Sequence, residues 1–62
     1  MTHANRFVYD SARTRVEAEL RLEDYFASGE ISPAESPLIQ TRNHVFADGI
    51  SRTSYNITLA AD

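Results

Sequence analysis

The residues most often used in catalysis are few in this 62-residue chain and are not grouped. There is no Cys, and His3 and His44, the two His residues, lie far apart in the sequence. His44 has no nucleophile and carboxylate around it at a recognisable catalytic spacing. The acidic residues Glu23 and Asp24 are adjacent, so on a helix their carboxylates point to different sides instead of converging. The sequence therefore predicts neither an enzyme nor a metal or cofactor site.

Charge is distributed unevenly along the chain. The net charge is −3, but most acidic residues lie between positions 17 and 35, where Arg21 is the sole basic residue. An acidic surface of this kind can steer a basic partner, including a protein surface that normally handles nucleic acid. We therefore predict that a protein partner binds an acidic surface formed by Glu17, Glu19, Glu23 and Asp24.

A helix is predicted over residues 10–28. Residues 14–22 alternate between apolar and polar as a strand does, but most of them are strong helix formers. Asp10 is a candidate N-cap, and Gly29 stands where a left-handed residue commonly ends a helix. Polar residues also recur at alternating steps of four and three, which places them in one stripe of a helix: Asp10, Thr14, Glu17, Arg21, Asp24 and Ser28.

The apolar part of this predicted helix is wider than one small sheet can cover. A surface helix typically has an apolar stripe of roughly 100°, whereas two adjoining groups here take up more than half of the circumference. The first group is Tyr9, Ala12, Val16, Leu20 and Ala27, and the second is Ala18, Leu22, Tyr25 and Phe26. Either the chain itself covers both groups, or one packs on the sheet while the other meets a second copy or a partner. Since small chains without disulfides are often supported by oligomerisation, we predict a homodimer with the second group at its interface.

Strands are predicted on both sides of the helix. Residues 32–36 form a turn with the Ser-Pro-x-Glu pattern of a capping box, and residues 38–46 and 50–59 form a hairpin. Of two registers, only the one with a three-residue loop and Gly49 in the left-handed conformation collects the apolar residues on one face. Residues 5–9 form a further strand, which either pairs with the hairpin or lies against the helix. The predicted fold is a single α+β domain, one long helix on a short antiparallel sheet in the order β-α-β-β.

The predicted register gives the hairpin a mildly basic outer face. Sheets that bind single-stranded nucleic acid combine cations with stacking aromatic side chains, and the candidates on this face are Arg42, His44, Phe46 and Arg52. A net-acidic chain is a poor phosphate binder overall. Direct nucleic-acid binding is therefore the alternative hypothesis.

The leading hypothesis is a small non-enzymatic interaction module that binds and modulates or inhibits a larger protein complex. Small proteins encoded by phages and mobile elements, anti-CRISPR inhibitors among them, are a natural class for such a chain, although no residue carries a resemblance to a particular family. The first residues lack the apolar run of a signal peptide, and no segment is long enough to span a bilayer. The expected location is therefore cytoplasmic.

Overall fold

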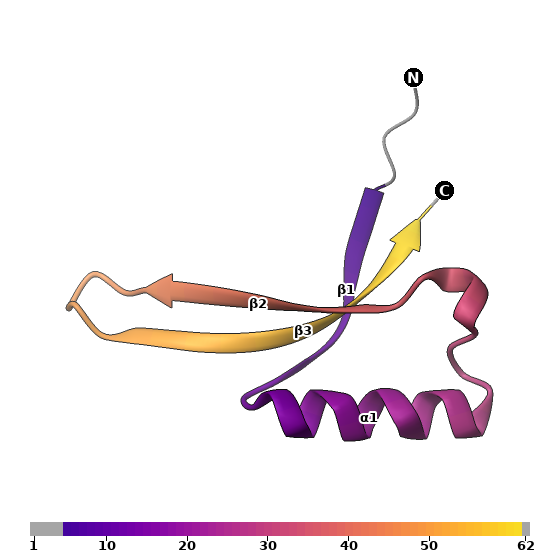
Figure 1. The fold of residues 1–62 in the computed structure, drawn as a ribbon. Helices are drawn as coiled ribbons and strands as arrows, with labels where there is room; N and C mark the ends of the chain where they lie inside the picture. Colours follow the sequence, from indigo (N-terminus) through magenta and orange to yellow (C-terminus); the bar gives the residue numbers. More distant parts are fainter. Residues whose placement is uncertain (1–4, 62) are drawn as a thin grey trace.

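The computed structural model describes residues 5–61, which form one helix and a three-stranded sheet. The elements are β1 (Asn5–Ala12), α1 (Arg15–Ser28), the short 3-10 helix η1 (Pro33–Glu35), β2 (Leu38–Val45) and β3 (Ser51–Ala61). The sheet is antiparallel with the order β1-β3-β2, and α1 lies along one side of it (Figure 1). The predicted α+β class and the β-α-β-β order are confirmed, and β1 joins the sheet. Within the described residues, no helix is both long and apolar enough to cross a membrane.

The boundary between β1 and α1 differs from the prediction of a strand over residues 5–9 and a helix from residue 10. β1 continues to Ala12, and α1 begins at Arg15. Thr14 is the N-cap: its backbone is extended, and its side-chain oxygen accepts a hydrogen bond from the Glu17 N–H. Asp10 and Thr14 are four residues apart in the same polar stripe, so helical spacing fits either as a cap. The pairing of β1 with β3, which continues to Ala12, decides between them.

The end of α1 and the turn that follows it are as predicted. Gly29 has a φ of 79° in the left-handed region, and its N–H donates to the Phe26 carbonyl. In η1, the Ser32 hydroxyl accepts a hydrogen bond from the Ala34 N–H, while the Glu35 carboxylate accepts one from the Ser32 N–H. The capping box that the sequence indicated is thus present.

The hairpin of β2 and β3 has the predicted register. The Phe46 N–H donates to the Ile50 carbonyl at 2.8 Å, and Gly49 has a φ of 87°, as a three-residue loop requires. Ile39 lies opposite Ile57, so both side chains point to the same face of the sheet. This face is the one that α1 covers.

A β-bulge interrupts the pairing of β1 with β3. Val8 lies opposite Thr58, but Asp10 lies opposite Ile57, so Tyr9 is the extra residue. In a regular strand, Asp10 would lie opposite Asn56 and point away from the helix. The bulge therefore moves the Asp10 side chain to the side of the sheet on which α1 lies.

The core is small and lies where α1 packs against the sheet. Ala18 of α1 is fully buried, and Leu22 and Tyr25 pack around it as partly buried residues. The small Ala18 side chain lets the helix approach the sheet closely. The buried apolar residues are Ala12, Ala18, Ile31, Ile57 and Leu59.

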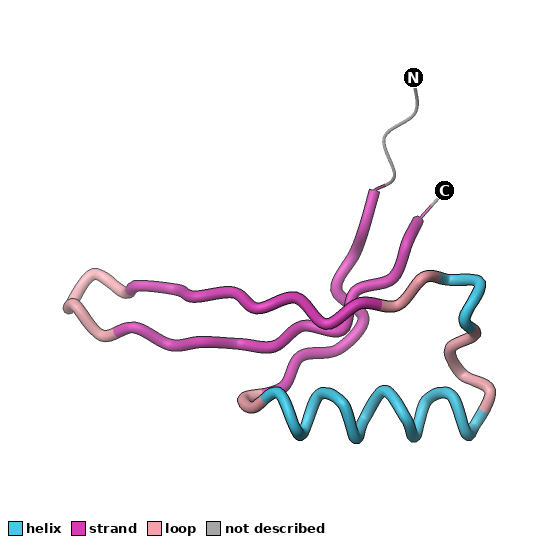
Figure 2. The backbone as a smooth tube through the Cα atoms, viewed as in Figure 1, coloured by secondary structure: helices cyan, strands magenta, loops and turns pink. Residues whose placement is uncertain are grey.

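The distal half of the hairpin extends away from this core as a two-stranded projection (Figures 1 and 2). We call residues 41–53 the arm, and every one of them is exposed. The molecule is correspondingly flat and extended, measuring 40 × 34 × 11 Å along its principal axes. Its radius of gyration is 13.4 Å, whereas a compact chain of this length has roughly 11 Å. The helix therefore covers only part of the sheet.

Replacing Ala18 with Leu tests which side of α1 is internal. Ala18 is fully buried, so a larger side chain there must displace its neighbours, and we expect the free energy of unfolding to fall by about 1–3 kcal/mol. The matched control is Ala27→Leu, the same substitution at an exposed position of the same helix, with an expected change within about 0.5 kcal/mol. Urea unfolding followed by circular dichroism measures both. Equal losses of stability would show that Ala18 lies outside the core.

Candidate binding surfaces

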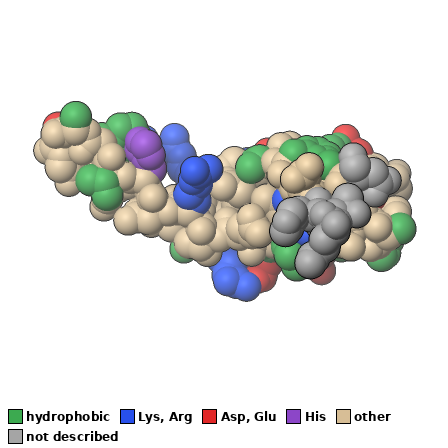
Figure 3. Space-filling model, turned by 90° about the horizontal axis from the view of Figure 1, so that it is seen from above, with side chains coloured by type: hydrophobic (Ala, Val, Ile, Leu, Met, Phe, Trp, Pro, Cys, Tyr) green, Lys and Arg blue, Asp and Glu red, His purple; other side chains and the backbone are tan. Residues whose placement is uncertain are grey.

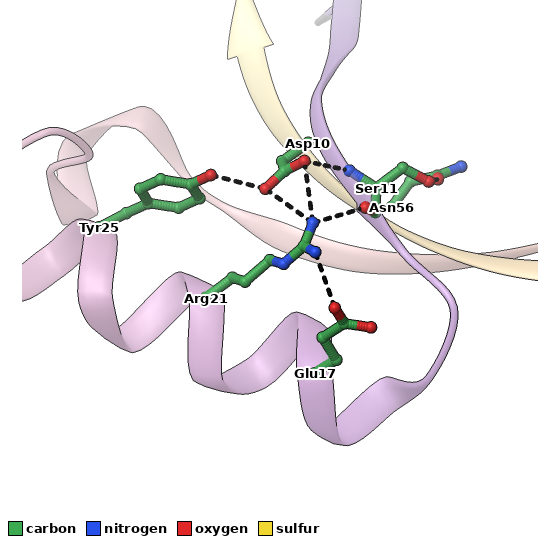
Figure 4. A network of polar contacts seen from close by, with 6 residues as sticks. All are labelled: Asp10, Ser11, Glu17, Arg21, Tyr25 and Asn56. Carbon is green, nitrogen blue, oxygen red and sulfur yellow. Dashed lines mark hydrogen bonds and ion pairs between the residues drawn. The ribbon is translucent and has the colours of Figure 1, made fainter.

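A network of polar side chains attaches α1 to the bulge of β1 (Figure 4). The Asp10 carboxylate accepts a hydrogen bond of 2.6 Å from the Tyr25 hydroxyl and forms an ion pair of 3.3 Å with Arg21. Arg21 also pairs with Glu17 at 2.7 Å and donates to the Ser11 carbonyl at 2.9 Å. These contacts join strand and helix side chains and thereby fix how α1 is oriented on the sheet.

The network shifts the pKa values of Asp10 and Tyr25 in the directions expected of structural contacts. The hydrogen bond from Tyr25 lowers the pKa of Asp10, and the Ser11 N–H and Arg21 add to this against the opposing effect of burial. The same hydrogen bond raises the pKa of Tyr25, because it holds the proton on the phenol. A general base works best with a pKa near the operating pH, and the pKa of Asp10 is moved away from it. Asp10 is therefore a charged anchor for the helix.

Two of the four acidic residues predicted to bind a partner have basic partners on α1 itself. Glu17 pairs with Arg21, and Glu19 pairs with Arg15 at 3.2 Å. Glu23 and Asp24 are exposed, and neither takes part in an ion pair with another of residues 5–61. The carboxylates of α1 that remain open to a partner are therefore these last two.

The residues predicted to form a dimer interface face the sheet of their own chain. Ala18 is fully buried, Leu22 and Tyr25 pack against the core, and only Phe26, with 39 % of its surface exposed, stays largely accessible. This corrects the prediction for Ala18, Leu22 and Tyr25, which pack within their own chain. Of the first group, Val16, Leu20 and Ala27 are exposed on α1, whereas Ala12 lies in β1 and is buried. The sequence shows how wide the apolar arc is, but the side that meets the sheet depends on how the helix is attached.

The side of α1 that points away from the sheet carries apolar residues of the other group. Val16 is 65 % exposed and Leu20 is 56 % exposed, and Ala27 continues their row along the helix. At about 100° per residue, Glu23 and Asp24 border this row on its two sides. We call this surface the outer helix face, and its residues are Val16, Leu20, Glu23, Asp24 and Ala27.

The arm carries a second exposed surface, which has the opposite charge. Arg42, His44 and Phe46 point to one side of β2, and the register places Arg52 opposite His44 and Ile50 opposite Phe46. The rings of His44 and Phe46 are in edge-to-face contact with centroids 4.6 Å apart. Figure 3 shows hydrophobic, histidine and arginine side chains along the arm. We call this surface the arm face, and its residues are Arg42, His44, Phe46, Ile50 and Arg52.

The arm face brings together all four residues predicted as an alternative nucleic-acid surface. It also includes Ile50, which is 55 % exposed and was not among the candidates. The three-residue loop was the signal that could have identified Ile50, because it pairs this residue with Phe46. A shallow depression of about 210 Å³ at the tip is lined by Phe46, Asp48, Ile50 and Arg52.

Both surfaces have the composition of binding sites, with exposed apolar side chains bordered by charged ones. In the part of the chain that the structure describes, no group of three or more His, Asp or Glu side chains is arranged to hold a metal ion. Each surface therefore offers a ligand an apolar contact area that is bordered by charged side chains.

Replacing Asp10 with Asn tests the network through its pH dependence. Because the pKa of Asp10 is lowered in the folded state, its carboxylate stabilises the fold fully at pH values above the unfolded pKa of about 3.9. This stabilisation is lost as the pH falls through the lower pKa of the folded state. Because the pKa of Tyr25 is raised, the hydrogen bond that its hydroxyl donates to Asp10 is lost only when the pH rises above about 10. We therefore expect Asp10→Asn to be less stable than wild type by about 1 kcal/mol at pH 7, and this difference to shrink toward pH 3.

Thermal unfolding at both pH values measures the effect, with Asp24→Asn as the control, because Asp24 is exposed and joins no ion pair among the described residues. A destabilisation by Asp10→Asn that stays the same at acidic and neutral pH would contradict the role of the Asp10 carboxylate.

Comparison of the chain with known protein families, with curated proteins and with solved structures finds no match. The chemistry of the outer helix face and of the arm face is therefore the basis on which a function is proposed.

Proposed function

We propose that this chain is a small non-enzymatic interaction module that binds a larger protein through its outer helix face and thereby modulates or inhibits it. The observation that carries the proposal is the exposure of Val16 and Leu20 in one row on the side of α1 opposite the core. Contiguous apolar side chains on a surface, rimmed by polar residues, mark an interaction site. Such a row on a helix suits a partner with a hydrophobic groove.

The borders of the outer helix face specify the charge of this partner. Glu23 and Asp24 lie on opposite sides of the apolar row and are exposed, so the rim of the groove must supply basic groups. A protein surface that normally binds nucleic acid combines these properties, and complementary charge speeds its association with the helix. The interaction is expected to weaken as salt screens the charges.

The absence of cysteine bears on the cellular compartment in which the protein acts. A chain without cysteine does not depend on an oxidising compartment, and we propose the cytoplasm as its location. The target is then a larger cytoplasmic protein complex of the kind that proteins of phages or mobile elements inhibit.

Affinity capture from a lysate of the cells that encode the chain tests this function. Leu20→Glu places a carboxylate on the outer helix face, and Val45→Glu makes the same kind of change at a position of the arm that is 63 % exposed. We expect Leu20→Glu to reduce the amount of captured partner at least tenfold, because a central apolar contact contributes more than about 1.4 kcal/mol. Val45→Glu, the matched control, should capture as much as wild type. Equal capture by both variants would exclude the outer helix face as the binding surface.

A second candidate function is supported by the arm face. Arg42, Arg52 and His44 share this face with Phe46, which is 45 % exposed, and cations beside an accessible aromatic ring suit single-stranded nucleic acid. Fluorescence anisotropy with labelled single-stranded DNA and RNA tests it. We expect the chain to bind at low salt and to lose affinity steeply as salt is added. The double variant Arg42→Ala/Arg52→Ala should not bind. No binding of the wild type at low salt would eliminate this function.

A further inference from the structure

The outer helix face and the arm face are complementary to each other. Both have apolar side chains at the centre. Carboxylates border the first, whereas guanidinium groups border the second, whose one nearby carboxylate, Asp48 at the tip, accepts a hydrogen bond from the Ile50 N–H. None of the ion pairs formed within residues 5–61 involves these bordering groups, which are Glu23, Asp24, Arg42 and Arg52. Each surface therefore carries charges of the sign that would pair with those of the other surface.

The two surfaces do not meet within one chain. The outer helix face lies on the side of α1 opposite the buried Ala18, while the tip of the arm projects past the start of α1 (Figure 1). The exposed fractions of Leu20 and Ile50, 56 % and 55 %, agree with this separation. Contact between the surfaces consequently requires two molecules.

The lengths of the two surfaces match. From Val16 to Ala27 the apolar row extends about 17 Å along the helix axis, at 1.5 Å per residue. From Arg42 to Phe46 the arm face extends about 13 Å, at 3.3 Å per residue. The arm face can therefore lie along most of the apolar row.

The exposed area is large enough for an interface of ordinary size. The chain exposes 4807 Å², whereas a compact monomer of 7.0 kDa exposes about 4,000 Å². The difference, about 800 Å², is what each partner buries in a protein interface of standard size. The extended shape thus exposes about 800 Å² more than a compact fold of the same mass would.

We propose that the arm face of one chain docks on the outer helix face of a second copy of this chain. Phe46 and Ile50 then lie against the apolar row of α1, and the two arginines of the arm face lie beside the carboxylates of the outer helix face. Because two different surfaces meet, the contact is either made twice in a reciprocal two-fold pair or made head to tail, in which case it closes into a larger ring or extends into a chain.

This self-association rests on the proposed function in one respect, because it uses the same outer helix face. A second copy and a larger partner compete for that face. Self-association therefore lowers the amount of chain available for partner binding as the protein concentration rises.

Sedimentation velocity over a concentration series tests the contact. We expect the wild-type mass to rise above 7.0 kDa with concentration and to return toward it at high salt. Phe46→Ser and Leu20→Glu, on the two surfaces, should both remain monomeric. Val45→Glu should associate like wild type, because Val45 points to the opposite side of the arm from its neighbour Phe46. A monomeric wild type at the highest concentration would overturn the proposal.

Charge reversal tests the pairing of the surfaces directly. In Glu23→Arg/Asp24→Arg both surfaces are basic, and in Arg42→Glu/Arg52→Glu both are acidic, so each variant alone should stay monomeric. An equimolar mixture should associate, because the arm of each variant then meets a helix of opposite charge in the other. Circular dichroism establishes that both variants are folded. A mixture of folded variants that stays monomeric would overturn the proposal.

The same variants separate this inference from the proposed function. Phe46→Ser should abolish self-association and leave capture of the larger partner intact. A monomeric wild type whose partner capture is still lost in Leu20→Glu would refute the self-association alone. Self-association with no partner lost in Leu20→Glu would refute the proposed function alone.

Discussion

The β-bulge at Tyr9 is the feature on which the arrangement of the helix depends. It adds one residue to β1 and so turns Asp10 toward α1, where the carboxylate contacts Tyr25 and Arg21. With these contacts made, Ala18 lies against the sheet and the opposite side of α1 faces outward. The contacts made at the bulge thus orient α1 so that Ala18 is internal while Val16 and Leu20 are exposed. The bulge lies on β1 and contributes no residue to the outer helix face, yet it orients the helix that carries this face.

The small core explains why so much apolar surface remains exposed. One helix of fourteen residues covers only the part of the sheet where all three strands meet, and the arm has no helix above it (Figure 2). A chain of this size has little apolar area with which to offset the loss of conformational entropy. Burying Val16, Leu20, Phe46 and Ile50 against another molecule would add to that area. Binding and stability are coupled in such a protein, since whatever covers these residues also favours the folded state.

Charge is separated along the sequence and, as a result, in space. The acidic residues are concentrated on the helix and the segment after it, whereas Arg42 and Arg52 lie in the hairpin. Folding keeps the outer helix face and the arm face apart, so their charges do not neutralise each other within the chain. This arrangement supports both a basic protein partner on the helix and a second copy of the chain. Competition between the two would make partner binding sensitive to protein concentration.

Interactions between residues close in the chain were readable from the sequence, and those that join distant segments were not. Gly29 and the capping box around Ser32 and Glu35 involve residues close in the chain, and the three-residue loop at Gly49 follows from the alternation of apolar residues in the hairpin. The sequence by itself therefore determined the end of α1, the turn after it, the hairpin register and every residue of the arm face except Ile50. The start of α1, the bulge and the buried side of the helix were decided by tertiary structure alone. They result from contacts of β1 and α1 with β3, more than forty residues farther along the chain in the case of β1, and helical periodicity fits either solution equally well.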